Sequence, residues 1–327
     1  MKRPLAGTMA LLIVTQCASV PSVSWRPVLA AAAAPTPVLW RDPGNIAARD
    51  LLWGAASPDR APRPPFVFLQ EDASGSKPKI HVRDAVGRTW SVKFDRRSGR
   101  GREVPSEVAA TRIAWGLGYF VEETYLVKEG VIEHTGALTR GRRVLDANGR
   151  FKSARFEPRP DDVERLDTRW RIDDNPFAGS KELSGLVALA ALLNNWDFRA
   201  GNTTVLRVKT EGGLEDRYIV SDWGTAFGRM SPRRSRWNLE HYQNAAPFFA
   251  PPADGHLDFN IEPDDESHGA RIPVEHARWF SDLASQLTER QLRAAFEAAD
   301  ATDAEVRGFA QAVARRIARL HAATHGK

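Results

Sequence analysis

The sequence predicts an α+β fold with two lobes: a small, mainly β-stranded N-terminal lobe that holds one helix, and a larger, mainly helical C-terminal lobe. Three observations lead to this prediction. Short apolar or alternating runs between residues 66 and 94 are typical of strands. A helical apolar pattern and two further strand-like runs follow, up to residue 133. After residue 180 the pattern is mostly helical.

Composition sets the first bounds on function. The chain has 327 residues, of which 42% are hydrophobic and 27% are charged, and this composition excludes a disordered chain. The net charge of +5 suggests anionic ligands, but it is too small to indicate nucleic acid, and we expect no nucleic-acid partner. A single cysteine excludes an intramolecular disulfide.

Residues 1–37 are expected to form a signal peptide and a linker. Met1-Lys2-Arg3 precedes an apolar run from Leu5 to Val14, which is typical of a secretory signal. This run is too short to span a bilayer comfortably, and no later segment is apolar enough, so we expect no membrane span. Cys17 stands where a lipid-modified cysteine would stand, but Gln16 replaces the small residue expected before it, so a lipid anchor at Cys17 is the minority interpretation. We expect an exported protein, either periplasmic or extracellular.

Residues 38–135 are expected to form a lead-in and the small lobe. The expected elements are strands at 66–69, 80–82 and 89–94, a helix from Pro105 to about Leu117, and strands at 119–127 and 130–133. The turn Ser74-Gly75-Ser76-Lys77 lies between the first two strands, where a phosphate-covering loop would lie. It holds one glycine, so an ordinary hairpin turn is equally well supported.

Residues 136–327 are expected to form the large lobe. The expected elements are a hairpin at 144–156 around Asn148-Gly149, a helix at 180–194, strands at 203–208 and 217–220, and helices that follow capping boxes at Thr288 and Thr302. The segments 157–177 and 224–253 are expected to be irregular.

Two segments after the helix at 180–194 hold the candidate catalytic and metal-binding residues. Asp197 and Asn202 stand five positions apart, and Asp222 ends an apolar strand and is followed by Trp223-Gly224. Phosphoryl transfer from ATP uses such groups in this chain order: an Asp beside the incoming hydroxyl, then an Asn and a later Asp as ligands of Mg²⁺. Each motif alone is also typical of an ordinary turn. Their order, with a helix before them and a short hairpin between them, favours the functional interpretation.

Lys93 and Glu107 are the candidate nucleotide-binding pair. Lys93 lies in a predicted strand, from which it could reach the α- and β-phosphates, although a lysine that snorkels from an edge strand would look the same. Glu107 lies at the edge of the apolar face that holds Ala110 and Ala114, where an unpaired acid is costly. We therefore expect an ion pair between Lys93 and Glu107. Glu103 precedes the expected start of the helix and should face water.

Other polar residues give weaker signals. Four arginines follow the Asp222 motif and could hold an anionic acceptor, although a solvated basic loop is the favoured interpretation; they are Arg229, Arg233, Arg234 and Arg236. The eight histidines show no metal-ligand spacing with the cysteine or with one another.

The candidate residues resemble those of the protein-kinase-like superfamily, and of its atypical branches more than of ordinary protein kinases. The segment from Asp197 to Asn202 is similar to the D-x-x-x-G-N loop of aminoglycoside phosphotransferases, and Asp222-Trp223-Gly224 is similar to their metal-binding motif. The order of the motifs also resembles that of HipA-type kinases and of secretory-pathway kinases. In its Asn-Asn-Trp-Asp and Ser-Asp-x-Gly segments, the chain also resembles an uncharacterised group of exported bacterial proteins, and this resemblance implies a shared fold and no particular activity.

Carried over by position, the resemblance implies a two-lobed, protein-kinase-like fold in which each candidate has a role. Lys93 would bind phosphates, Glu107 would hold Lys93, Asp197 would be the catalytic Asp, and Asn202 and Asp222 would bind metal. This sequence departs from the family's pattern in two places, because no histidine lies near Asp197 and the phosphate-covering loop is poor in glycine.

The function implied by the resemblance is an exported phosphotransferase that uses ATP with Mg²⁺, or with Mn²⁺, on an unknown acceptor, either a protein or an anionic small molecule. ATP is scarce outside the bacterial cytoplasm, which keeps open a pseudokinase-like binding module that has lost turnover. A further alternative is transfer of a nucleotidyl group, because the same residues would serve that reaction.

We predict that export removes about the first 17 to 34 residues, because a charged start and an apolar run precede a stretch rich in alanine. Mass spectrometry of the protein from its native host measures the mature N-terminus. Intact Met1 on a cytoplasmic protein would show that this expectation is wrong.

Overall fold

The computed structural model describes residues 34–72, 77–95, 102–230, 233–261 and 271–326. The predicted signal peptide and most of the linker lie outside the described residues, as do positions 74–76 of the turn Ser74-Gly75-Ser76-Lys77.

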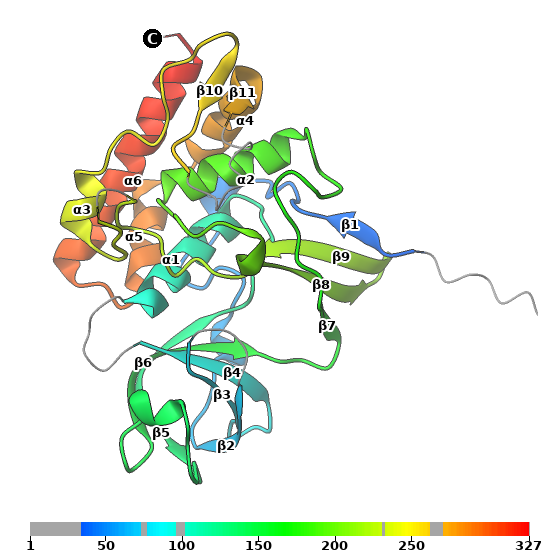
Figure 1. Ribbon diagram of the computed structural model, residues 1–327, viewed down its shortest axis with the longest axis vertical. Coiled ribbons are helices and arrows are strands. Elements are labelled where there is room, and N and C mark those ends of the chain that lie inside the picture. Colours follow the sequence, from blue (N-terminus) through cyan, green and yellow to red (C-terminus); the bar gives the residue numbers. More distant parts are fainter. Residues whose placement is uncertain (1–33, 73–76, 96–101, 231–232, 262–270, 327) are drawn as a thin grey trace, which may run out of the picture. The chain divides into compact units, whose positions relative to one another are not determined.

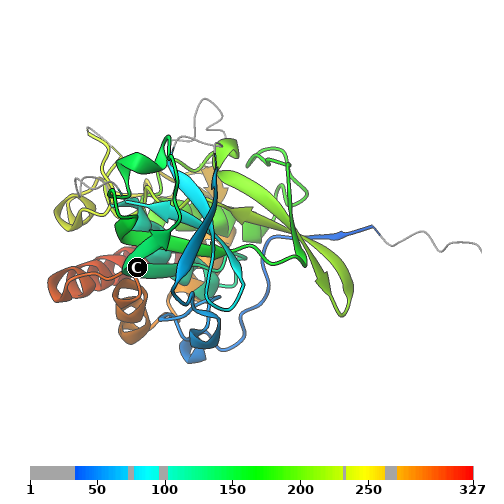
Figure 2. The ribbon, with the colours of Figure 1, turned by 90° about the horizontal axis from the view of Figure 1, so that it is seen from below.

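A five-stranded barrel forms the first part of the described chain (Figures 1 and 2). Its strands pair in the order β2-β3-β4-β6-β5, and a parallel pairing of β2 with β5 closes it. The strands are β2 (Phe66–Asp72), β3 (Lys79–Arg83), β4 (Thr89–Phe94), β5 (Tyr125–Glu133) and β6 (Arg150–Pro158). Aromatic side chains fill the interior; the rings of Phe66 and Phe156, for example, lie 4.7 Å apart.

Strand β4 is buried on both faces, which explains how a lysine comes to lie inside the protein. Trp90, Val92 and Phe94 point into the barrel core. Because side chains alternate along a strand, Ser91 and Lys93 point out of the barrel. They are nevertheless buried, since helix α1 (Glu103–Gly116) lies against this part of the barrel.

The start of α1 is fixed by a residue that lies outside the helix. One carboxylate oxygen of Asp95, just after β4, accepts the backbone N–H groups of Glu103 (2.8 Å) and Val104 (3.0 Å). The other oxygen accepts the hydroxyl of Ser153 in β6 (3.0 Å). Asp95 thus satisfies two of the free N–H groups at the helix start and ties α1 to both strands.

The rest of the described chain contains a four-stranded sheet, which includes a strand that precedes the barrel, and five helices (Figure 1). The sheet has the order β1-β9-β8-β7, with strands β1 (Thr36–Val38), β7 (Val163–Leu166), β8 (Thr203–Thr210) and β9 (Gly213–Val220). The helices are α2 (Lys181–Leu192), α3 (Leu239–Gln243), α4 (Val274–Ala284), α5 (Glu289–Glu297) and α6 (Asp303–Thr324). The short strands β10 (His256–Asp258) and β11 (Arg271–Pro273) pair with each other. Short 3₁₀ helices lie at Ile46–Ala48, Pro58–Arg60, Gly141–Arg143 and Ala200–Asn202.

The buried apolar residues form two clusters. The smaller one fills the barrel. The larger one joins α1 to helices α2, α4, α5 and α6 and to the four-stranded sheet. Helix α1 therefore belongs to the larger core, although its acidic side chains reach the barrel. Among the residues that the structure describes, no helix has both the length and the apolar character that crossing a bilayer requires.

Several expected elements are corrected by the structure. A single strand, β5, stands in place of the two expected at 119–127 and 130–133. No hairpin covers 144–156, because β6 pairs with β4 and β5, and the Asp146 carboxylate accepts the N–H groups of Asn148 and Arg150 in a turn. Strand β7 lies in the segment expected to be irregular, the short helix α3 lies in the other, and the end of the expected linker is β1. Both predicted capping boxes, at Thr288 and Thr302, are present.

We predict that Asp95→Ala lowers the free energy of unfolding by about 1–2 kcal/mol, because the start of α1 loses its acceptor. Urea unfolding measures the change. Asp95→Asn keeps one acceptor oxygen and should cost less, and Asp59→Ala at the surface should cost about 0.5 kcal/mol or less. Equal effects of the three changes would contradict the capping role.

Candidate active site

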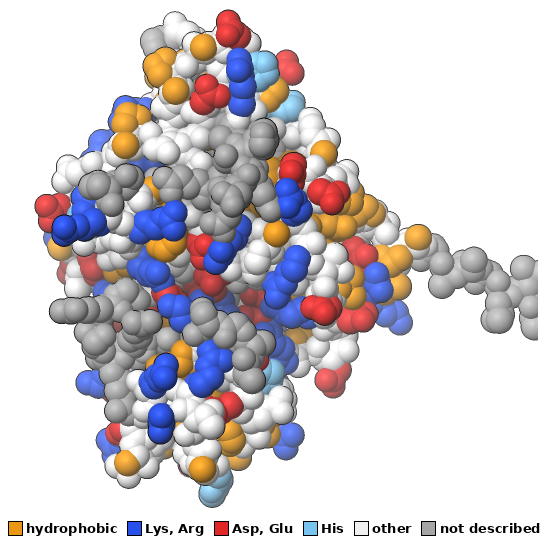
Figure 3. Space-filling view, viewed as in Figure 1, with side chains coloured by type: hydrophobic (Ala, Val, Ile, Leu, Met, Phe, Trp, Pro, Cys, Tyr) orange, Lys and Arg blue, Asp and Glu red, His pale blue; other side chains and the backbone are white. Residues whose placement is uncertain are grey.

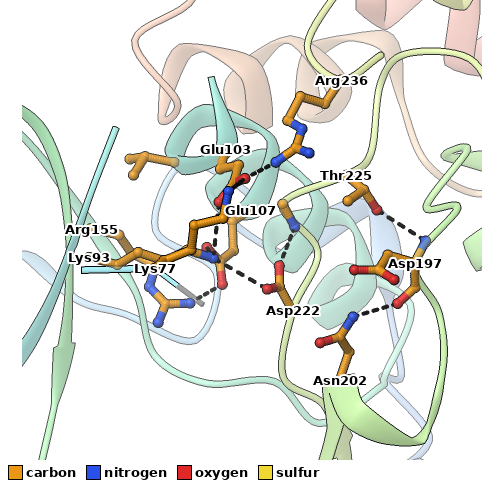
Figure 4. Close-up of polar contacts among 12 residues, drawn as sticks. Lys77, Lys93, Glu103, Glu107, Arg155, Asp197, Asn202, Asp222, Thr225 and Arg236 are labelled. Carbon is orange, nitrogen blue, oxygen red and sulfur yellow. Dashed lines mark hydrogen bonds and ion pairs between the residues drawn. The ribbon is translucent and has the colours of Figure 1, made fainter. Parts of the chain in front are cut away.

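Lys93, Glu107 and Asp222 meet in a buried ion cluster (Figure 4). The Lys93 Nζ atom lies 3.1 Å from Glu107 Oε2 and 3.3 Å from Asp222 Oδ2. The side chains of Lys93 and Glu107 are 3% and 1% exposed. The ion pair that the sequence predicts between Lys93 and Glu107 is thus present, and Lys93 does not snorkel into solvent. Asp222 joins the pair from the other side of the site.

The expectation that Glu103 faces water is wrong. Because Asp95 caps the chain at Glu103, α1 starts two residues before Pro105. Glu103 and Glu107 then stand one turn apart and share a face of the helix. Glu103 lies 2.5 Å from the Lys77 amine and 3.7 Å from the Lys93 amine, and it also pairs with Arg236.

Arg155 is a member of the cluster that sequence reasoning missed. It lies in β6 directly opposite Lys93 in β4, and Lys79 in β3 lies opposite Lys93 on the other side. Opposite residues project from the same face of a sheet, so three cations form a row across the outside of the barrel. Arg155 binds Glu107 Oε1 and, at 2.6 Å, Glu157 Oε2. Glu107 therefore serves two cations, one with each oxygen.

Burial and neighbouring charges together shift the pKa of each group. Burial alone would lower the pKa of Lys93, but Asp222 and Glu107 outweigh burial and raise it. Burial would raise the pKa of Asp222, but Lys93 and the N–H of Gly224 hold it below its usual value. Burial dominates at Glu107 and raises its pKa in spite of Arg155 and Lys93. Burial also lowers the pKa of Lys79, and the nearby Arg155 and Lys93 add to this effect.

The loop after α2 carries Asp197 and Asn202. The Asn202 amide nitrogen donates to the backbone carbonyl of Asp197 (2.7 Å), which turns the amide oxygen away from that carbonyl. The Asp197 carboxylate lies 2.9 Å from Arg199 Nε and is 28% exposed. The backbone N–H of Ser221 donates to the carbonyl of Asn202 (2.8 Å). Because Ser221 directly precedes Asp222, this bond holds the loop next to Asp222, as Figure 4 shows for Asp197 and Asn202.

Gly224 lies so close to Asp222 and Glu103 that no larger residue fits at this position. The N–H of Gly224 donates to Asp222 Oδ1 (2.8 Å). A Cβ atom on Gly224 would lie 2.9 Å from that oxygen and 3.3 Å from the Cβ of Glu103. A side chain at this position would therefore displace the carboxylate that the sequence predicts to bind metal.

Asn195 clamps the two loops together, and sequence reasoning gave it no role. Its amide oxygen accepts the hydroxyl of Thr225 (2.5 Å), and its amide nitrogen donates to the backbone carbonyl of Asp222 (3.3 Å). The neighbouring Asn194 donates to the carbonyl of Gly228 (2.8 Å) and accepts from Arg316 (2.7 Å). The Asn-Asn pair before Trp196 was a signal for this role, because buried amides can bridge two backbones.

The side chains of three of the four arginines that follow Asp222 contact other residues of the protein. Arg236 binds Glu103 and thus belongs to the ion cluster. Arg229 donates to the backbone carbonyl of Arg233 (3.0 Å), and the guanidinium of Arg234 lies 5.0 Å from the ring centre of Trp196. Figure 3 shows lysine and arginine side chains spread over the face in view, with acidic side chains among them.

Two cavities lie near these residues. A cavity of about 470 Å³ is bounded by the connection that follows β6 and by strands β8 and β9. Pro158, Pro160, Leu206 and Ile219 give it apolar walls, and Glu157 links it to Arg155 of the cluster. A larger cavity of about 870 Å³ lies along β5 and β6 and includes Asp95. None of the five predicted site residues lines either cavity.

No family model matches the chain, and no curated protein matches it. Among solved structures, it is similar to the Helicobacter pylori proinflammatory kinase CtkA, with 15% identity and a TM-score of 0.49 over 81% of this chain and 99% of that chain. It is also similar to the Golgi casein kinase, with 12% identity and a TM-score of 0.42 over 86% of this chain and 82% of that one. A structure of the Golgi casein kinase with Mn/ADP bound matches with 12% identity and a TM-score of 0.43, over 83% and 77% of the two chains.

We predict that Glu107→Ala lowers the free energy of unfolding by about 3–5 kcal/mol, because it leaves Lys93 and Arg155 buried without their shared carboxylate. Glu103→Ala should cost less, about 1–3 kcal/mol, because its partners lie nearer the surface. Urea unfolding measures both changes.

Glu129→Ala, at an exposed position of β5, is the control and should change stability by about 0.5 kcal/mol or less. A Glu107→Ala protein as stable as this control would show that the cluster does not hold α1 to the barrel.

Proposed function

We propose that this protein is an exported, two-lobed phosphotransferase of the atypical-kinase kind that uses ATP with Mg²⁺, or with Mn²⁺. One observation carries the proposal: Lys93 is buried between Glu107 and Asp222, while Asp197 and Asn202 lie on a loop that is bonded to the strand end before Asp222. The spacing of these residues in the sequence is also found in ordinary turns. Ordinary turns, however, give no reason for a buried lysine beside Asp222. Export rests on the N-terminal sequence pattern.

The residues present fit a divalent cation. The Asp222 side chain is 35% exposed and its carboxylate is held ionised, while Asn202 turns its amide oxygen away from the Asp197 carbonyl. Carboxylate and amide oxygens are the ligands that Mg²⁺ and Mn²⁺ prefer. When bound, such an ion neutralises phosphate charge and orients the phosphates.

The chain's own residues would do the rest. Lys93 would hold phosphate oxygens, and Glu107, which is itself held by Arg155, fixes its position. Asp197 is near enough to the surface to receive an acceptor hydroxyl, orient it and take its proton late in the transfer. The cavity of about 470 Å³ has apolar walls and a size suited to a nucleoside.

One observation favours the second candidate function, a pseudokinase-like module that binds nucleotide without turnover. Arg199 lies 2.9 Å from the Asp197 carboxylate, and a guanidinium there weakens an aspartate as a base. Nucleotidyl transfer would use the same residues as phosphoryl transfer. The acceptor, whether a protein or an anionic small molecule, is left open.

Isotope transfer tests the proposal. We predict that label from γ-labelled ATP, and not from α-labelled ATP, reaches an acceptor in a panel of proteins and small molecules. Asp197→Asn should reduce the rate about a hundredfold or more, because a positioned base contributes at least that much. Asp258→Asn, at an exposed position, is the control.

Thermal unfolding separates binding from turnover. At about 100 times the dissociation constant, Mg²⁺-ATP should add about 2.7 kcal/mol of stability to the wild type and to Asp197→Asn, but not to Asp222→Asn. Binding without transfer of either label would leave the pseudokinase-like module, transfer of α-label would indicate a nucleotidyl transferase, and no binding would overturn the proposal.

A further inference from the structure

Two histidines and an aspartate form a cluster near the C-terminus. None of the three belongs to the kinase-like site. His321 and His325 stand at the C-terminal end of α6, marked C in Figure 1, and Asp282 lies on the neighbouring helix α4. The sequence was expected to show no metal-ligand spacing among its histidines. That expectation is wrong, because residues four apart on a helix share a face.

The distances among the three side chains suit a metal ion. The Nε2 atoms of His321 and His325 lie 3.4 Å and 3.2 Å from the same oxygen, Asp282 Oδ1. Ligand atoms about 2.0–2.1 Å from a tetrahedral Zn²⁺ lie about 3.3 Å from one another. Both contacts are close to this edge length.

The hydrogen bonds of His325 strengthen this interpretation. Its Nδ1 atom lies 2.9 Å from the backbone carbonyl of His321. A carbonyl can only accept, so Nδ1 carries the proton. In the neutral ring, Nε2 then presents a lone pair toward a carboxylate oxygen, and two acceptors at 3.2 Å repel each other unless a cation or a proton lies between them. A carbonyl that fixes the tautomer in this way is the usual support of a metal-binding histidine.

The two helices are locked together beside the cluster. The buried hydroxyls of Ser281 and Thr324 lie 3.0 Å apart, and Arg278 donates to the carbonyl of Thr324 (2.9 Å). These residues are the direct neighbours of Asp282 and His325 or stand one turn before Asp282. The ligand side chains are therefore presented by a rigid frame, which reduces the entropy lost when a metal binds. The rings of His321 and His325 are stacked, with centres 4.0 Å apart and planes 15° apart, so one ring has to turn about its side-chain bonds before both Nε2 lone pairs point at one ion.

We propose that Asp282, His321 and His325 form a binding site for a first-row divalent ion, with Zn²⁺ as the ion that fits best. Two imidazoles and a carboxylate are a ligand set typical of Zn²⁺, and the partly exposed position of all three leaves room for water as the fourth ligand. The ion would link the end of α6 to α4. The site is separate from the residues proposed to bind Mg²⁺ and nucleotide, so it stands independently of the proposed function.

Calorimetric titration of the untagged full-length chain with ZnCl₂ at neutral pH tests the proposal. We expect a saturable site for one Zn²⁺ per chain, and a higher unfolding temperature that a chelator reverses. His321→Ala and His325→Ala should each weaken the affinity at least tenfold, and Asp282→Asn should weaken it as well. Binding of Co²⁺ in place of Zn²⁺ should give a visible absorption that the His325→Ala variant lacks.

Two controls keep the result specific. His134→Asn removes an exposed histidine far along the chain, and Asp222→Asn removes the predicted Mg²⁺ ligand; neither should change the Zn²⁺ affinity. Without metal, the unfolding temperatures of His321→Ala, His325→Ala and Asp282→Asn should match that of the wild type, which excludes misfolding as the cause of a loss. Undiminished Zn²⁺ binding in His321→Ala and His325→Ala, or no saturable binding in the wild type, would overturn the proposal.

Discussion

The shared carboxylate of Glu107 is the interaction on which the site depends. Strand pairing places Lys79, Lys93 and Arg155 side by side on the barrel, and neighbouring cations repel one another in a buried environment. Glu107 binds Lys93 with one oxygen and Arg155 with the other, so the row is stable only while α1 lies against it. Lys93 can therefore stay charged in the interior only while α1 keeps Glu107 in this position.

Helix α1 can meet this constraint because it is held by forces that do not involve the cluster. Its apolar residues, among them Val108 and Ile113, belong to the larger core, and Asp95 fixes where the helix starts. Burial of apolar side chains against α5 and the sheet supplies the stabilisation that offsets the desolvation of the ions. A buried ion cluster alone is weak evidence for stability, but here it sits on a helix that would be placed without it.

The sequence predicts those parts of the site that depend on local periodicity. Alternation identifies the strand of Lys93, helical spacing places Glu107 beside buried alanines, and a helix followed by a hairpin frames Asp197, Asn202 and Asp222. It does not predict Arg155, because the pairing of β4 with β6 joins segments that β5 separates in the chain. It misplaces Glu103 because the cap of α1 comes from Asp95, eight residues away. The roles of the five predicted site residues stay predictions until transfer and binding are measured.

Three carboxylates lie near the Lys93 amine, with Glu103 at 3.7 Å. The two that accept its hydrogen bonds are not equivalent, and this difference bears on how a ligand would enter. An ammonium group has three N–H donors, and Glu107 and Asp222 take two of them. Glu107 is almost fully buried and also holds Arg155, whereas Asp222 is 35% exposed and has Lys93 and the Gly224 N–H as partners. A ligand would therefore displace Lys93 from Asp222 and leave its bond to Glu107 intact. Once Asp222 serves a cation, Lys93 regains a donor for a phosphate, so cation and nucleotide should bind more tightly together than either does alone.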